Sequence, residues 1–226
     1  MKLVTANIGR KSSVAGVWSD VRKVKNAAPG AIVGWQEIDE GDPADEHRIL
    51  RKVLRRANRL IGMRTKVPIS LPRRRYRVLE KRIVFAAKGI PHVSPTRWVV
   101  ETLVQDKRNA AIVFVVINVH YPAGAWNAKK NERAEADRME GWKDMFGVHK
   151  ARVKYWHDKG VTVFWVGDVN RMDMPKVHPK EVQVVTKGID SISYIEGNVL
   201  VKAIRTGVII LKSDHNAHWA VFHLSP

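Results

Sequence analysis

The hydrophobic pattern of this chain consists of short apolar runs, several of which end abruptly in polar residues. Runs rich in Val, Ile and aromatic residues, with little alternation, are typical of strands that are buried on both faces. The clearest example is 161–167, VTVFWVG, which leads directly into Asp168-Val169-Asn170. The predicted strands are 2–8, 31–39, 82–87, 97–104, 110–119, 161–167, 190–195, 198–204, 207–211 and 218–224.

Helical spacing of apolar residues predicts three helices between these strands. Segment 12–30 begins with Ser and ends at a Pro-Gly pair, and segment 43–61 has acids in its first turn, as the helix dipole favours. Segment 127–160 is dense in helix formers and stops at Gly160, so it predicts a long helix with an interruption near Gly147.

Strands outnumber helices, and helices lie between some of the strands, which favours an α/β sandwich. The 226 residues are enough to bury one substantial core, and no change in composition marks a linker. We therefore expect a single domain over residues 1–226.

The charge is unusual, because 40 Lys and Arg residues against 22 Asp and Glu residues give a net charge of +18. Such a surplus favours a polyanionic partner, nucleic acid before an anionic membrane. Arg73, Arg74 and Arg75 stand in the Pro-flanked segment 68–78, an expected loop, and are candidates for contact with backbone phosphates.

The sequence has no run of 18 apolar residues and no charged-then-apolar start, so we expect a cytoplasmic protein without a membrane span. It contains no cysteine, which excludes disulfides, cysteine nucleophiles and thiolate metal sites.

Polar residues of metal-ligand or acid-base type recur where the apolar strands stop. Any one of them is more often a turn residue or a cap than a catalytic group. Their repetition in chain order indicates a site, because loops at strand ends of layered α/β folds present reactive groups. These residues are Asn7, Glu37, His120, Asp168, Asn170, Asp214 and His215.

The same positions carry an ordered set of short motifs that resembles the endonuclease/exonuclease/phosphatase superfamily, with its deoxyribonuclease I-like fold. The motifs are TANIG (5–9), GWQEI (34–38), NVHYP (118–122), WVGDVN (165–170), GIDSISYI (188–195) and SDHNAHWAV (213–221). One departure is Asn216, where relatives usually have Pro after the His. The resemblance implies a four-layer α/β/β/α sandwich, with two mainly antiparallel sheets flanked by helices, and metal-dependent phosphoester hydrolysis.

By this resemblance Glu37 is the first metal ligand, with Asn7 and Asp214 near it. Hard oxygen donors of this kind suit Mg²⁺ or Mn²⁺. The metal would neutralise charge that develops on the phosphate and its leaving oxygen.

The resemblance also assigns the groups that act on water. His215 is the expected base or phosphate-contacting imidazole, and Asp190 is the carboxylate that fixes its tautomer. Asp168 and Asn170 are expected to orient or activate the attacking water.

A second His-carboxylate pair distinguishes branches of the superfamily. His120 stands where many abasic-site endonucleases have Tyr, which points away from that branch. Glu80 falls where deoxyribonuclease I-like members place the partner of that His. Arg97 is similar to the phosphate-binding Arg of the family, although a surface Arg near a turn explains it equally well.

We therefore expect a divalent-metal-dependent phosphodiesterase, most consistent with a monomeric DNA endonuclease of little sequence specificity. A nucleic acid is favoured over a small or lipid phosphate, because charge spread over the whole chain suits a long polyanion. Among nucleic acids, DNA is expected before RNA. One alternative is a phosphatase or phosphodiesterase of small or lipid phosphates. Another, of a different class, is a catalytically silent nucleic-acid-binding protein.

Overall fold

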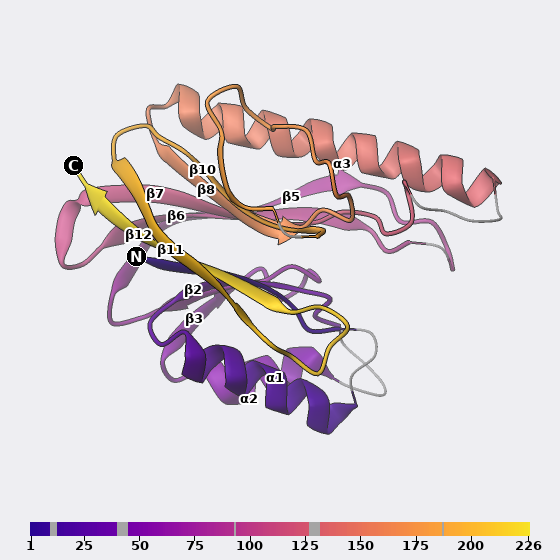
Figure 1. Cartoon of the computed structure of the whole chain (residues 1–226), viewed down its shortest axis with the longest axis horizontal. Helices are drawn as coiled ribbons and strands as arrows, with labels where there is room; N and C mark the ends of the chain where they lie inside the picture. Colours follow the sequence, from indigo (N-terminus) through magenta and orange to yellow (C-terminus); the bar gives the residue numbers. More distant parts are fainter. Residues whose placement is uncertain (10–12, 40–44, 93, 127–131, 187) are drawn as a thin grey trace.

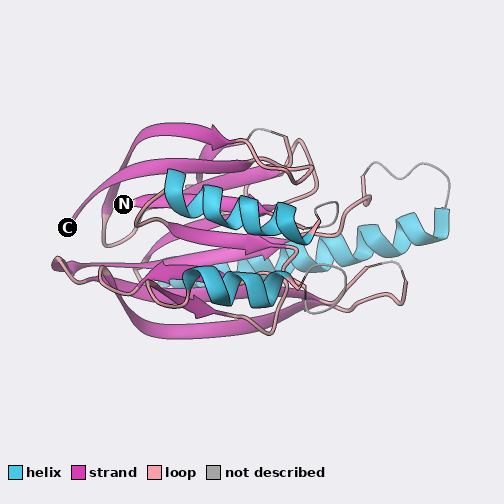
Figure 2. Ribbon diagram, turned by 90° about the horizontal axis from the view of Figure 1, so that it is seen from below, coloured by secondary structure: helices cyan, strands magenta, loops and turns pink. Residues whose placement is uncertain are grey.

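The computed structural model describes residues 1–9, 13–39, 45–92, 94–126, 132–186 and 188–226. Two six-stranded sheets pack face to face, and helices cover their outer faces (Figures 1 and 2). Within the described residues, no helix is both long and apolar enough to cross a membrane. The predicted four-layer α/β/β/α sandwich is confirmed.

The first sheet has the strand order β11-β12-β1-β2-β4-β3. Helices α1 (Val14–Ala27) and α2 (Glu46–Leu54) lie against its outer face (Figure 1). Its strands are β1 (Lys2–Asn7), β2 (Ile32–Gln36), β3 (Asn58–Ile61), β4 (Ile69–Pro72), β11 (Leu200–Ile209) and β12 (Ala217–Ser225).

The second sheet has the order β5-β6-β7-β8-β10-β9, and the long helix α3 (Glu132–Asp158) covers its outer face (Figure 1). Its strands are β5 (Tyr76–Ala87), β6 (Arg97–Asp106), β7 (Asn109–His120), β8 (Thr162–Asp168), β9 (Val182–Val185) and β10 (Asp190–Ile195).

Two parallel pairs at the centre of the sheets bring polar strand ends to one edge of the sandwich. In the first sheet β1 runs parallel to β2, and Asn7 is level with Gln36. In the second sheet β7 runs parallel to β8, and His120 is level with Asp168. The other paired strands are antiparallel. Since β1 also packs on β8, the four strand ends face one another across the two sheets.

Three apolar layers explain why the central strands show so little alternation. One lies between the sheets, one under α1 and α2, and one under α3. Every residue of β8 is buried, because Phe164 and Val166 point between the sheets while Val163 and Trp165 point to α3. The expectation of a strand buried on both faces is met.

The predicted helix 43–61 is too long. Residues 40–44 lie outside the described part of the chain, and α2 ends at Leu54. Residues 58–61 form β3, which pairs with β4 so that Ile61 enters the layer between the sheets. Burial of this apolar residue by strand pairing outweighs the helix propensity of the segment.

The predicted loop 68–78 is also wrong in part, because it contains β4 and the start of β5. Proline ends β4 at Pro72, where the chain turns. Helix α3 passes through Gly147 without interruption, since an exposed glycine there disturbs no packing. The strand β11 is continuous over two predicted short strands, and β9 was not predicted.

Helix α3 supports the loops at the polar edge from behind. The indole nitrogen of Trp142 donates to the carbonyl of Val169 at 3.0 Å, directly after Asp168. His149 is fully buried, with Nδ1 2.9 Å from the hydroxyl of Tyr121 and its ring edge-on to Trp165. Burial lowers the pKa of His149 from 6.5 to about 3.

This buried imidazole predicts acid sensitivity of the fold. The unfolded chain takes up a proton below about pH 6.5, whereas folded His149 does so only near pH 3, so its contribution to stability is lost between these values. Wild type should lose about 2 kcal/mol more than His149→Gln between about pH 7 and about pH 5. Urea unfolding of both proteins at the two pH values measures this. Equal losses would show that His149 is not the titrating group.

Candidate active site

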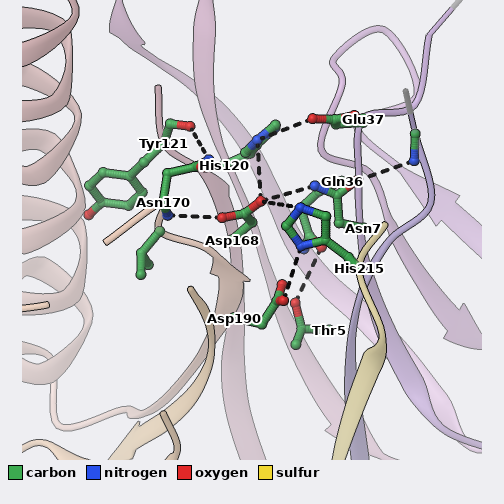
Figure 3. A network of polar contacts seen from close by, with 12 residues as sticks. Thr5, Asn7, Gln36, Glu37, His120, Tyr121, Asp168, Asn170, Asp190 and His215 are labelled. Atoms are coloured by element: carbon green, nitrogen blue, oxygen red, sulfur yellow. Dashed lines mark hydrogen bonds and ion pairs between the residues drawn. The ribbon is translucent and has the colours of Figure 1, made fainter. Parts of the chain in front are cut away.

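The carboxylate of Asp168, only 1% exposed, is the centre of the polar edge (Figure 3). Its Oδ2 accepts a hydrogen bond from the amide nitrogen of Asn7 at 3.0 Å. The same oxygen lies 3.7 Å from Nε2 of His120 and 3.7 Å from Nε2 of His215. Groups from β1, β7 and the loop before β12 therefore meet at one carboxylate oxygen.

The loop after β8 is fixed by Asn170, which has a positive φ of 50°. Asn adopts this left-handed conformation more readily than most residues. Its backbone N–H donates to Oδ1 of Asp168 at 2.9 Å, and its side-chain nitrogen donates to the carbonyl of Tyr121 at 3.0 Å. Asp168 and Asn170 therefore form a rigid pair.

His215 is paired with Asp190, as the motifs predicted. Its Nδ1 lies 3.2 Å from Oδ2 of Asp190, which opens β10 opposite Asp168. Burial lowers the pKa of His215, but the hydrogen bond to Asp190 and the charge of Asp168 outweigh it and raise the pKa to about 9. At neutral pH this imidazole is a cation.

The carboxyl group of Asp168 holds its proton more strongly than an ordinary aspartate does. Complete burial and the charge of Asp190 raise its pKa well above the usual range, although His215 and the hydrogen bonds from Asn170 and Asn7 act against this. A carboxylate with a raised pKa is a stronger proton acceptor than one in water.

The loop before His215 is held by Asp20 of α1, a residue that the sequence analysis missed. The buried carboxylate accepts hydrogen bonds from the N–H of Lys212 at 2.8 Å and from that of Ser213 at 2.9 Å. An acid on the buried face of an apolar helix was the available signal. Through this contact α1 positions the segment that carries His215.

Glu37 stands at the open side of the site with a positive φ of 58° and a side chain 21% exposed. Gly9 packs against it so closely that an added Cβ would lie 2.2 Å from Cβ of Glu37. One carboxylate oxygen lies 3.8 Å from Nε2 of His120, beyond hydrogen-bond distance.

A second network beneath the site joins the two sheets. The side-chain nitrogen of Gln36 donates to the amide oxygen of Asn118 at 2.7 Å. Asn118 in turn donates to the carbonyls of Trp35 at 2.8 Å and Pro68 at 3.0 Å. Both residues stand inside the recognised motifs, but no role was assigned to them because their partners are distant in sequence.

The predicted partner of His120 is not brought to it. Glu80 is level with Leu103 on β6, and its carboxylate binds the guanidinium of Arg82. Phe85, five residues further along β5, pairs with Trp98, the residue nearest to the level of His120. At about 3.3 Å per residue, Glu80 is roughly 17 Å too far along the strand.

Arg97 lies beside the site, since its guanidinium donates to the carbonyl of His120 at 3.3 Å. Asp214 is exposed and accepts from the hydroxyl of Ser213 at 3.4 Å, and its charge adds to the raised pKa of His215. Both residues are therefore near the predicted centre.

The three adjacent arginines of the segment 68–78 lie away from the candidate site. Since β4 runs antiparallel to β2, the turn that follows β4 lies at the end of the sandwich opposite Glu37. Arg73 donates to the carbonyl of Asn58 there, and Arg75 pairs with Asp106 at 3.1 Å. The structure does not bring Arg73, Arg74 and Arg75 to the site.

Two sets of donors at this edge fit a divalent cation. One oxygen each of Asp168 and Asp190 and a ring nitrogen of His215 lie within 4.8 Å of one another. A metal bound by this set would have to displace the proton of His215, whose pKa is raised by Asp190 and Asp168. The partly exposed carboxylate of Glu37 has hard oxygens that suit Mg²⁺ or Mn²⁺, and Gly9, which packs on Glu37, donates its N–H to the amide oxygen of Asn7 at 3.3 Å.

Comparison with known proteins identifies the fold. No protein-family model matches the sequence, and no curated protein is significantly similar to it. An endonuclease/exonuclease/phosphatase structure from Bacteroides vulgatus covers 99% of this chain and 98% of its own, with 16% identity and a TM-score of 0.71.

Two further structures have a named activity or ligand. TDP2 of D. rerio, in complex with a single-strand DNA product, covers 99% of this chain and 98% of its own, with 13% identity and a TM-score of 0.74. A mannosyl-6-phosphatase of Bacteroides thetaiotaomicron covers 99% of both chains, with 11% identity and a TM-score of 0.68.

The molecule is thus an α/β/β/α sandwich with a carboxylate-imidazole site at one edge. It has the deoxyribonuclease I-like fold of the endonuclease/exonuclease/phosphatase proteins, which confirms at the level of the fold the resemblance carried by the motifs.

The pairing of His215 predicts a measurable titration. In metal-free wild type the imidazole should titrate at about 9, and Asp190→Asn should lower this pKa because the charged hydrogen bond is lost. Asp214→Asn is the matched control and should lower it less, since its charge is the smallest of the contributions. NMR titration of the ring protons measures all three proteins. Equal shifts in both variants would contradict the assigned pair.

Proposed function

We propose that this protein is a divalent-metal-dependent phosphodiesterase that hydrolyses nucleic acid, as a DNA endonuclease of little sequence specificity. The observation that carries this proposal is the meeting of Asn7, His120 and His215 at one buried oxygen of Asp168. The fold alone would permit many functions, so the argument rests on this site.

Asp168 is the proposed proton acceptor for the attacking water. Its raised pKa makes it basic, and Asn170 holds it from the other oxygen. His215, protonated at neutral pH, contacts the phosphate as a cation and stabilises its negative charge. In this proposal His215 therefore contacts the phosphate, and Asp168 rather than His215 is the base.

His120 and Arg97 belong to the same side of the site. The imidazole of His120 faces both Asp168 and Glu37, and Arg97 holds the backbone of His120 through its guanidinium. We assign His120 to contact with the phosphate. Arg97 positions His120 in this proposal, and its 7% exposure argues against broad contact with a polymer.

Glu37 and Asn7 would hold the divalent metal, and Asp214 precedes His215 in the chain close enough for its charge to raise the pKa of that imidazole. The metal, when bound, would supply Lewis-acid stabilisation of charge on the phosphate and the leaving oxygen. The tight packing of Gly9 on Glu37 supports a fixed ligand rather than a mobile surface acid.

The charge of the chain supports a polymeric substrate. A net charge of +18 attracts a polyanion over a long range and strengthens binding through counterion release. The DNA-bound structure of the fish protein is consistent with this proposal. The phosphatase neighbour keeps a small phosphate ester as the second candidate, and a panel of duplex DNA, single-stranded DNA, RNA and an inositol polyphosphate separates the two.

Metal dependence tests the role of Glu37. Glu37→Gln should weaken Mn²⁺ binding and reduce hydrolysis of a chromogenic phosphodiester by about a hundredfold, because an amide is a neutral and weaker ligand. Asp39→Asn, which alters an exposed acid two residues away that pairs with Lys66, is the matched control and should leave both unchanged. Calorimetric titration with Mn²⁺ measures binding independently of turnover. Full activity of wild type in EDTA would refute the metal assignment.

Asp168→Asn tests the proton acceptor. Hydrolysis should fall by roughly a hundredfold or more, as for other lost proton-transfer groups. The variant should still fold, because the amide is isosteric and burial already disfavours the charged form of this carboxyl, although one acceptor of the N–H groups of Asn7 and Asn170 is lost. Asp173→Asn, at an exposed position of the same loop, serves as the control. An unfolded Asp168→Asn protein would instead indicate a structural role.

A further inference from the structure

The second sheet exposes an apolar and aromatic surface beside the candidate site. It consists of Ile83 and Phe85 on β5 and Trp98 on β6, which we call the aromatic strip. Ile83 is 47% exposed and Phe85 53% exposed, and Phe85 meets Trp98 edge-on with ring centroids 5.7 Å apart. Large apolar side chains gathered in this way commonly mark an interaction surface.

The exposure follows from unequal strand lengths. Ile83 pairs with Val100 and Phe85 with Trp98, so these residues point to the face that packs on the first sheet. The first sheet ends on that side with β3, which has 4 residues, whereas β5 has 12. The end of β5 therefore extends beyond its cover, and its inner face is left open.

The strip begins next to the site. Trp98 directly follows Arg97, whose guanidinium binds the carbonyl of His120. The pairing of Val100 with Asn118 places Trp98 level with His120, so Phe85 lies two strand spacings, about 10 Å, from His120. This distance is roughly that of three stacked nucleotides at about 3.4 Å each.

Positively charged side chains lie near the aromatic strip, where they could attract a polyanion. Lys81 is exposed on the same face, and Arg64 is exposed on the segment after Gly62, which packs against Val100. The carboxylates of β5 and β6 in this region lie on the opposite face, where Glu80 binds Arg82 and Glu101 binds Arg152. Lys81 and Arg64 therefore place positive charge beside the exposed aromatic face, whereas Glu80 and Glu101 lie on the other face of the sheet.

We propose that the aromatic strip stacks the unpaired bases of a single-stranded nucleic acid whose backbone leads into the site at Asp168. Exposed aromatic rings beside cationic side chains bind single strands with little sequence preference, because every base has a π face. In a duplex the bases are paired and stacked on each other, so their faces are not available to Phe85. The inference rests on the proposed function, whose substrate class it narrows to single strands or unpaired ends.

The exposed apolar side chains of the edge strand β11 provide a control. β11 exposes Ile204 at 53%, the same fraction as Phe85, but it borders the first sheet on the side away from β5. Ile204→Ala therefore removes an equally exposed apolar side chain from an edge strand without touching the strip. It separates a specific contact from a general loss of surface hydrophobicity.

Binding is measured with the full chain in EDTA, using a fluorescent single-stranded oligonucleotide and the matching duplex. Phe85→Ala should weaken single-strand binding about tenfold and duplex binding much less. Phe85→Leu keeps the apolar bulk but has no π face, so it should weaken single-strand binding as Phe85→Ala does. Phe85→Trp has a π face and should retain binding. Ile204→Ala should leave single-strand affinity unchanged and should hydrolyse a small chromogenic phosphodiester as wild type does.

Three outcomes would contradict the proposed role of the aromatic strip. The first is unchanged single-strand affinity in Phe85→Ala. The second is equal loss for single strand and duplex. The third is a dimer in wild type that Phe85→Ala converts to monomer while nucleic-acid binding is retained, which would make the surface an interface between copies. Because binding is measured without turnover, a protein that binds through Phe85 but hydrolyses nothing would refute the proposed function and leave the strip intact.

Discussion

The buried carboxylate of Asp168 is the constraint on which the rest of the site depends. An ionised group removed from water is costly unless hydrogen-bond donors and opposite charges surround it. The chain supplies these with Asn7 from the first sheet and His215 from the end of the chain, both distant in sequence, and with Asn170 from the following loop. Closing this arrangement requires both sheets to be correctly packed, so the fold and the chemistry are specified together.

Three residues that do not contact Asp168 also hold parts of the site in place. Asp20 holds the backbone beside His215, Trp142 holds the loop after Asp168, and Asn118 fastens the second sheet to the backbone of the first. Each connects elements far apart in sequence by a hydrogen bond to the backbone. A polar side chain that fixes backbone in this way limits the positions of neighbouring reactive groups without contacting a substrate.

The sequence was informative where local pattern and tertiary structure agree. The strand ending in Asp168 was predicted because burial on both faces leaves a continuous apolar run, and the pairing of Asp190 with His215 followed from the motif resemblance. Prediction was wrong where tertiary pairing decided the outcome. Residues 58–61 have helical propensity but complete a sheet, and Glu80 has the expected chemistry but the wrong register, which a single sequence does not reveal.

The hydrogen bond between Gln36 and Asn118 has a further consequence for how this protein would bind the proposed polymeric substrate. It fastens the two sheets directly beneath the strand ends, so the halves of the sandwich have little freedom to close around a ligand like jaws. When a protein cannot change its shape on binding, the ligand must change its conformation and bear the free-energy cost of doing so. A chain with freely rotating bonds bears that cost more easily than a stiff double helix, whose persistence length is about 150 base pairs. A protein built in this way would then select among polymeric ligands by their flexibility.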